Sequence, residues 1–159
     1  MRPFDRRRVE ADTRLIRAVA DFNNDGRPDL ALSVSTSWGN AGGVWHVYFR
    51  LADGSYAAPQ LAFWHPWALR IVPVADGETR IITYWHGSAQ EGDLVAYDVA
   101  GCEISEAKAT GLILRAGDGG DEADRRLYDI LFSSWPPVEH CRLKDFLRRR
   151  DCRWHKGYY

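Results

Sequence analysis

Residues 21–29 read Asp21-Phe22-Asn23-Asn24-Asp25-Gly26-Arg27-Pro28-Asp29 and stand between two apolar segments. The preceding segment, Thr13–Ala20, is mostly apolar, and the following segment, Leu30–Ser35, alternates Leu and Val with Ala and Ser. A period of two residues is typical of a β-strand that is buried on one face. The sequence therefore predicts a strand, a loop rich in Asp and Asn, and a second, half-buried strand.

The loop places oxygen-bearing side chains at alternate positions, which is the spacing that a hard cation requires. Ca²⁺ takes about six to eight oxygen ligands, and a chain that curls around one point can supply most of them. Gly26 permits the sharp turn that such a curl needs. The predicted ligands are the side chains of Asp21, Asn23, Asp25 and Asp29 and the backbone carbonyl of Arg27.

An Asx-rich turn without a metal is the alternative, because Asn and Asp side chains readily cap their own backbone. The loop carries three Asp in nine residues, however, and their carboxylates would repel one another unless a cation is bound. The site is not an EF-hand, since Leu32 occupies the position of the bidentate Glu and both flanks have strand character. We therefore expect a calcium loop between strands.

The chain also indicates an internal repeat. Val44–Leu51 is dense in β-branched and aromatic residues and ends at the turn Ala52–Ser55, which completes a first β unit over residues 13–60. At an offset of about 51 residues, Ile71–Gly77 falls on the loop, Arg80–Trp85 on the strand after it, and Asp93–Val99 on the aromatic strand. This second unit, residues 70–105, keeps an Asp-Gly turn but lacks the other ligand positions.

The C-terminal segment, residues 121–159, differs in character from the repeat units. Apolar residues at helical spacing occur around Leu127–Leu131, where the type of element stays open. Val138–Arg150 carries Leu143, Phe146 and Leu147 among basic residues, a pattern that predicts a short amphipathic helix. We expect one domain over residues 1–159, because a chain of this length can bury a sizeable core.

The loop and the strand that follows it, Asp21–Leu32, resemble the calcium-binding FG-GAP repeat, also called the VCBS or integrin α-type repeat. Val44–Phe49 and Asp53–Pro59 resemble the strand and turn that close this repeat, so the resemblance is strong over about residues 15–60 and weak over 70–105. It implies blades of a β-propeller with calcium in the loop, in an extracellular or periplasmic binding protein. Two or three units cannot close a ring, so we expect a mainly β fold of antiparallel blade-like units, arranged as a partial propeller or a sandwich, with a short C-terminal α-helix.

Composition and charge indicate which kinds of partner and which cellular location are compatible with the sequence. A formal net charge of −1 and a pI near 6.5 provide no overall field for nucleic acid, and no stretch is long enough to span a bilayer. Met1–Arg8 is basic but lacks the apolar region of a signal peptide. A cytoplasmic protein and an exported protein that has lost its leader both fit, and the scarcity of cytosolic calcium favours a periplasmic or extracellular location.

Other candidate groups are weaker. Cys141 and Cys152 could form a disulfide or remain free thiols. Four of the five His follow a Trp, as expected of strands that bury the Trp and expose the His. An acidic stretch could hold a second cation or simply be solvated, and a basic C-terminal run could contact an acidic protein or remain in water. The acidic stretch comprises Asp118, Asp121, Glu122 and Asp124, and the basic run includes Arg148–Arg150.

The sequence assembles no catalytic site, and we expect a non-catalytic protein. The leading hypothesis is an extracytoplasmic, calcium-stabilised β-domain that binds another protein, such as an inhibitor or immunity protein against a secreted effector enzyme like a peptidoglycan hydrolase. This last step is an analogy at the level of the fold. The alternative is a carbohydrate-binding module that uses exposed Trp residues as stacking platforms.

Overall fold

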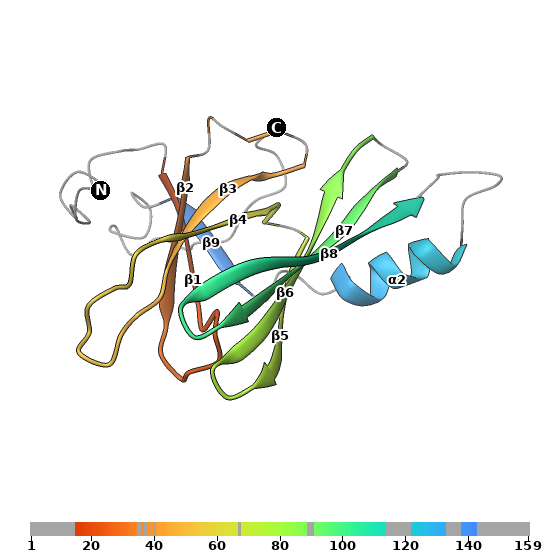
Figure 1. Cartoon of the computed structure of the whole chain (residues 1–159). Coiled ribbons are helices and arrows are strands. Elements are labelled where there is room, and N and C mark those ends of the chain that lie inside the picture. Colours follow the sequence, from red (N-terminus) through yellow and green to blue (C-terminus); the bar gives the residue numbers. More distant parts are fainter. Residues whose placement is uncertain are drawn as a thin grey trace.

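The computed structural model describes residues 15–34, 36, 38, 39, 41–66, 68–88, 91–113, 122–132 and 138–142. Figure 1 shows the elements of these ranges. They are β1 (Leu15–Ala20), β2 (Asp29–Val34), β3 (Gly43–Tyr48), β4 (Gln60–Trp64), β5 (Leu69–Ala75), β6 (Glu78–His86), β7 (Glu91–Ala100), β8 (Glu103–Ile113), α2 (Glu122–Phe132) and β9 (Glu139–Arg142).

The strands form two antiparallel sheets. The first has the order β4-β3-β2-β1-β9 and the second the order β5-β6-β7-β8, so β1–β4 and β5–β8 are two consecutive four-stranded meanders. Neither sheet closes on itself within the described residues, and side chains from both contribute to one core. The fold is therefore mainly β, as predicted, and sandwich-like rather than propeller-like.

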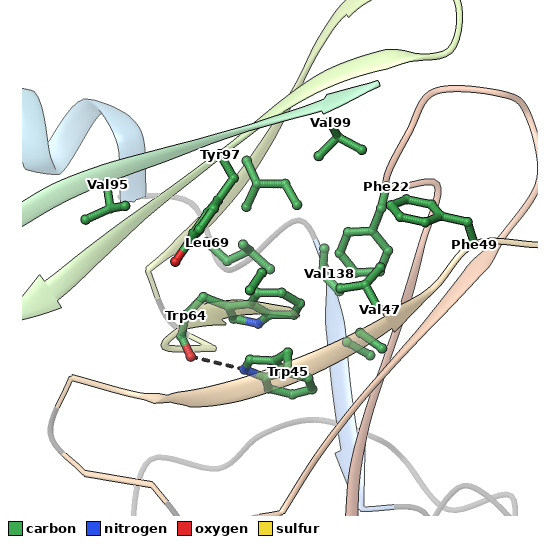
Figure 2. Packing of buried hydrophobic residues seen from close by; sticks show 14 of the residues in the cluster. Phe22, Trp45, Val47, Phe49, Trp64, Leu69, Val95, Tyr97, Val99 and Val138 are labelled. Atoms are coloured by element: carbon green, nitrogen blue, oxygen red, sulfur yellow. Dashed lines mark hydrogen bonds between the residues drawn. The ribbon is translucent and has the colours of Figure 1, made fainter. Parts of the chain in front are cut away.

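The core between the sheets is built around aromatic rings (Figure 2). The indoles of Trp45 and Trp64 stack with their centroids 4.6 Å apart, and Trp45 Nε1 donates a hydrogen bond to the backbone carbonyl of Trp64 at 3.1 Å. Phe22, from the loop between β1 and β2, lies 5.8 Å from Trp64. The second sheet contributes Leu69, Ile81, Val95, Tyr97 and Val99. The loop between β1 and β2 is thus anchored directly in the core.

Strand β2 departs from the half-buried pattern that its sequence predicts. Ala31 and Ser33 on one face and Leu32 on the other are all buried. The core face carries the small side chains, and the Ser33 hydroxyl accepts a hydrogen bond from the indole of Trp38 at 2.7 Å. Small residues are needed on this face because the neighbouring indoles occupy the space beside it.

The second meander begins differently from the predicted alignment. Ile71–Ala75, aligned with the metal loop, belongs to strand β5, and Asp76-Gly77 alone connects it to β6. Gly77 has a φ of +75°, which a two-residue hairpin turn of this kind requires. The β-branched Val72 and Val74 extend the strand where the first meander has loop residues.

The predicted helix at Val138–Arg150 is wrong at its beginning. Glu139–Arg142 forms β9, which pairs antiparallel with β1, while residues 143–150 lie outside the described part of the chain. The open edge of β1 offers unpaired backbone groups, and pairing with Glu139–Arg142 satisfies them. An α-helix, α2, forms in the segment whose type the sequence left open.

Helix α2 packs against the second sheet, on the opposite side from the core shared by the two sheets. The Tyr128 ring meets the buried Tyr84 ring edge to face at 5.1 Å, and Phe132 packs beside it. Leu127 and Ile130 remain exposed, at 40% and 64%. Glu122 and Asp124 lie in the first turn, where acidic side chains stabilise a helix. No helix in the described ranges has the length and apolar character needed to cross a membrane.

Candidate metal centre

The Asp21–Asp29 loop connects β1 to β2 and reverses direction at two residues in the left-handed region. Gly26 has a φ of +81°, as predicted from its place in the loop, and Asn24 has a φ of +57°. Asn adopts this conformation more readily than other residues that carry a side chain. These two positions allow the backbone to curl so that several Asp side chains turn inward.

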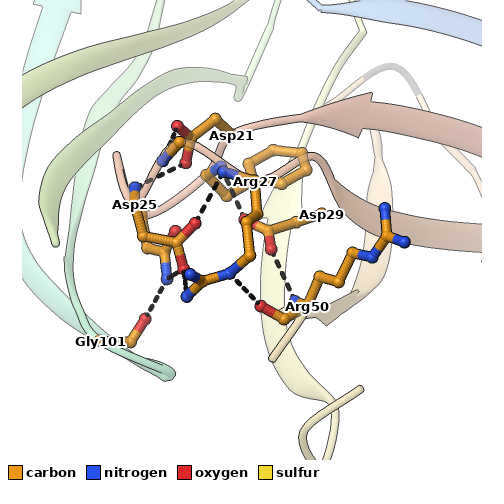
Figure 3. Close-up of polar contacts among 9 residues, drawn as sticks. Asp21, Asp25, Arg27, Asp29, Arg50 and Gly101 are labelled. Atoms are coloured by element: carbon orange, nitrogen blue, oxygen red, sulfur yellow. Dashed lines mark hydrogen bonds and ion pairs between the residues drawn. The ribbon is translucent and has the colours of Figure 1, made fainter. Parts of the chain in front are cut away.

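Asp21 and Asp25 organise the curl through hydrogen bonds from the backbone (Figure 3). Asp21 accepts the amide N–H groups of Asp25 at 3.0 Å and Gly26 at 2.8 Å, using both of its carboxylate oxygens. Asp25 Oδ1 accepts the N–H of Arg27 at 2.9 Å. The pattern is that of an Asx-type turn, so the part of the alternative interpretation that concerns local capping is correct.

Asp29 is the deepest carboxylate of the loop, with an exposed fraction of 1%. It accepts the N–H of Phe22 at 2.9 Å and the N–H of Arg50 at 2.8 Å. Burial raises the pKa of Asp29, the two N–H donors lower it, and the charges of Asp25 and Asp21 raise it, which together leave the pKa at about 6. Burial therefore makes the ionised form of Asp29 costly, the neighbouring carboxylates add to that cost, and a bound cation would offset it.

Asn23 provides the observation that fits a metal. Its side chain is 98% buried, and Nδ2 donates to Asp25 Oδ2 at 3.0 Å and to the Gly101 carbonyl at 2.8 Å. Asn23 Oδ1 is buried without a hydrogen-bond partner in the part of the chain that the structure describes. Buried acceptors are nearly always satisfied, and an amide oxygen is a suitable ligand for a hard cation.

Arg27 places a positive charge at the same loop. Its guanidinium lies 2.5 Å from Asp25 Oδ2, and its Nε donates to the Arg50 carbonyl at 3.0 Å. This ion pair neutralises part of the loop's charge from within the chain. The predicted inward orientation of the Arg27 carbonyl remains a prediction.

Among the described residues, no group of three or more His, Cys, Asp and Glu side chains is arranged to hold a metal ion by itself. A calcium site here would therefore need the Asn23 amide oxygen, a backbone carbonyl or water beside the carboxylates. The unpartnered Asn23 oxygen and the charged neighbours of Asp29 fit this mixed oxygen set. The chain's residues suited to it are the predicted ones, and calcium bound to them would supply charge neutralisation and cross-linking of the loop.

The Trp-His pairs fall into two kinds. Trp45 is buried with His46 exposed, as predicted for a strand, and Trp85 is half-buried with His86 exposed. His65 differs, because it follows the last residue of β4 and is only 8% exposed. Burial, with a smaller contribution from the charge of the nearby His86, lowers the pKa of His65 to about 4. The fourth pair, Trp154-His155, lies outside the described residues.

Several other sequence candidates also fall outside the described part of the chain. These are Cys152 with the side chain of Cys141, the acidic residues Asp118 and Asp121, and the basic run at Arg148–Arg150. Cys102 is half-buried with a free thiol.

The residues of the second sheet that form hydrogen bonds with the loop were not predicted from the sequence. Asn24 Nδ2 donates to the Ala75 carbonyl at 3.0 Å, the Thr79 hydroxyl donates to the Phe22 carbonyl, and Gly101 accepts from Asn23. The only available signal was the self-comparison, since Asn24 and Ala75 are 51 positions apart, which is the offset between the two units. An offset relates equivalent positions but does not say that they touch.

The chain matches no protein-family model, and comparisons with curated proteins and with solved structures find no significant similarity.

Proposed function

We propose that this protein is a calcium-stabilised β-domain that works outside the cytoplasm by binding another protein. The observation that carries the calcium part is the buried, unpartnered Oδ1 of Asn23, which stands in a loop with three carboxylates. The resemblance of this loop to the FG-GAP repeat supports the same assignment. The extracytoplasmic location follows from the supply of calcium there.

Calcium has a structural role in this proposal. Phe22 within the loop is fully buried against Trp64, and Asp29 at its end is buried at the start of β2. A cation that fixes the loop therefore fixes a piece of the core. The buried residues of the loop serve the fold, and we place the binding face elsewhere.

The test of the metal is thermal unfolding of metal-free protein with and without millimolar Ca²⁺. Binding to the folded state at 100 times Kd stabilises by about 2.7 kcal/mol, which for a domain of this size raises Tm by roughly 5 to 10 °C. The rise should disappear in Asp25→Ala. Equal melting of both proteins with Ca²⁺ and with EDTA would remove calcium from the proposal.

Protein binding is supported by exposed apolar side chains on the outer face of the first sheet. Val44 on β3 and Leu61 on β4, which flank the exposed His46, are 45% and 60% exposed. Sheet faces of this kind are common at protein interfaces. By contrast, none of the four Trp residues that the structure describes is fully exposed, and Trp45 and Trp64 are core residues. The exposed apolar side chains of Val44 and Leu61 are thus the observation that supports a protein partner.

Within this function, we infer an inhibitor or immunity protein against a secreted enzyme such as a peptidoglycan hydrolase, by analogy with small exported β-proteins. A pull-down from periplasmic extract should capture such an enzyme, and Leu61→Asp should abolish the capture while leaving Tm unchanged. Absence of any captured hydrolase, together with no protection against toxins encoded beside the gene, would remove this part. A glycan array with several hits would revive the carbohydrate alternative.

A further inference from the structure

We propose that the Asp21–Asp29 loop is a latch between the two sheets, and that cation binding to the loop and its docking on the second sheet stabilise each other. This inference rests on the proposed calcium site. It adds a property that a calcium loop does not have by itself, namely an energetic coupling between cation binding and the loop's contacts with the turns of the second sheet.

The first contact surface of the latch is the turn between β5 and β6. The backbone carbonyl of Asn24 accepts the N–H of Gly77 at 3.1 Å, and Asn24 Nδ2 donates to the carbonyl of Ala75 at 3.0 Å. Asn24 thus bonds to both sides of the turn, in one direction as acceptor and in the other as donor. Asn24 makes both bonds with its backbone in the left-handed conformation.

The second contact surface is the turn between β7 and β8. Asn23 Nδ2 donates to the Gly101 carbonyl at 2.8 Å, and the N–H of Gly101 donates in turn to the Gly77 carbonyl at 2.9 Å. The Thr79 hydroxyl, at the start of β6, donates to the Phe22 carbonyl. Both turns lie at one end of the second sheet, so a single loop joins them to the first sheet.

Asn23 is the residue through which the two events are coupled. One atom of its amide, Nδ2, holds the second sheet, and the other, Oδ1, is the unpartnered oxygen assigned to the cation. A cation bound at Oδ1 draws electron density toward this oxygen and polarises the amide group. The polarised amide then donates a stronger hydrogen bond from Nδ2. Because a coupling free energy is reciprocal, loosening the docked loop must also weaken cation binding.

Calorimetric titration of metal-free protein with Ca²⁺ tests this coupling with a matched pair of variants. Thr79→Val removes the hydroxyl that docks the loop, whereas Thr83→Val removes a buried hydroxyl on the same strand that has no hydrogen-bond partner in the described residues. On the scale of one hydrogen bond, we expect Thr79→Val to weaken Ca²⁺ binding by roughly threefold to tenfold. Thr83→Val should bind with the affinity of the parent protein.

Asn24→Gly is a second variant for the case in which Thr79→Val fails to fold. Gly accepts the left-handed conformation, so this substitution removes only the side-chain bond to Ala75 and touches no predicted ligand. It should also weaken Ca²⁺ binding. Hydrogen exchange provides an independent readout, because Ca²⁺ should slow the amides of Gly77 and Gly101 but not those of Gly87 and Ser88 at the opposite end of the sheet.

The outcomes separate the two proposals. If the parent protein shows no Ca²⁺ binding, the calcium site fails and the latch fails with it. If Ca²⁺ binds but Thr79→Val and Asn24→Gly keep the parent affinity, and Gly77 and Gly101 exchange at unchanged rates, the latch alone is overturned.

Discussion

The two meanders make their first connection in different ways. In the second meander, Asp76-Gly77 reverses the chain between β5 and β6 with two residues, while the first meander uses residues 21–28 between β1 and β2. Asp76 is exposed, but Asp29 and Asn23 are buried. Since a short turn suffices for chain reversal, the longer loop buries polar groups at a cost that only an additional role would offset.

The largest expected effect on stability is a difference between replacing Asp29, at the end of the first connection, and replacing Asp76, in the second. Asp29→Ala leaves the buried N–H group of Phe22 and the partly buried N–H group of Arg50 without an acceptor, and we expect it to lower the free energy of unfolding by about 2 to 4 kcal/mol. Asp76→Ala should change it by no more than about 0.5 kcal/mol, as is usual for a surface substitution. Urea denaturation in EDTA at pH 7 measures both, and similar losses would mean that Asp29 has no special place in the fold.

The difference between the two connections also explains which elements could be predicted from the sequence. Alternation and turn residues predict β1, β2, β3, β6 and β7, because a strand and a tight turn depend on residues close together in the chain. The β1–β2 loop was predicted for the same reason, since its Asp spacing is local. The turn at Gly77 was predicted as a turn, yet its neighbour Ile71–Ala75 was aligned with the loop, because similarity between repeats does not preserve element length.

Long-range contacts were beyond the sequence. Nothing local indicates that Asn24 docks on Ala75 or that Asn23 reaches Gly101, 78 positions away. The burial of His65 was missed because the end of β4 removes it from strand alternation. β9 was missed because its partner, the free edge of β1, lies far away in sequence. Ligand identities could thus be proposed from spacing, but the coupling of the loop to the second sheet required the structure.

A stability effect of intermediate size tests whether both connections, despite their different lengths, require a glycine with a positive φ angle. Gly26 and Gly77 have similar positive φ angles, and a Cβ at either position would meet no atom within 4 Å. Gly26→Ala and Gly77→Ala should therefore each cost about 1 kcal/mol, from backbone strain alone. The two variants should differ in how strongly they weaken Ca²⁺ binding, because Gly26→Ala strains the metal loop itself, whereas Gly77→Ala acts on the loop only through the docked turn. Thermal unfolding with EDTA and with Ca²⁺ distinguishes them, and a much larger loss for either variant in EDTA would contradict the strain argument.

The smallest expected effect on stability comes from removing an arginine that forms an ion pair, one in each meander. Arg27 pairs with Asp25 in the loop, and Arg80 pairs with Asp98 on the second sheet, where both side chains are about half exposed. Arg27→Gln should lower stability in EDTA by about 0.5 kcal/mol, because the partly exposed pair is screened by solvent. It should also enlarge the Ca²⁺-induced rise in Tm, since Arg27 no longer neutralises a predicted ligand.

Arg80→Gln is the matched control, as it removes an arginine from an ion pair that has no part in the loop. Its Ca²⁺-induced rise in Tm should equal that of the parent protein. If Arg27→Gln instead reduces the rise, the guanidinium supports the metal-bound loop rather than competing with the cation. Its bond to the Arg50 carbonyl would then be the relevant one, because it ties the loop to the residue whose N–H donates to Asp29.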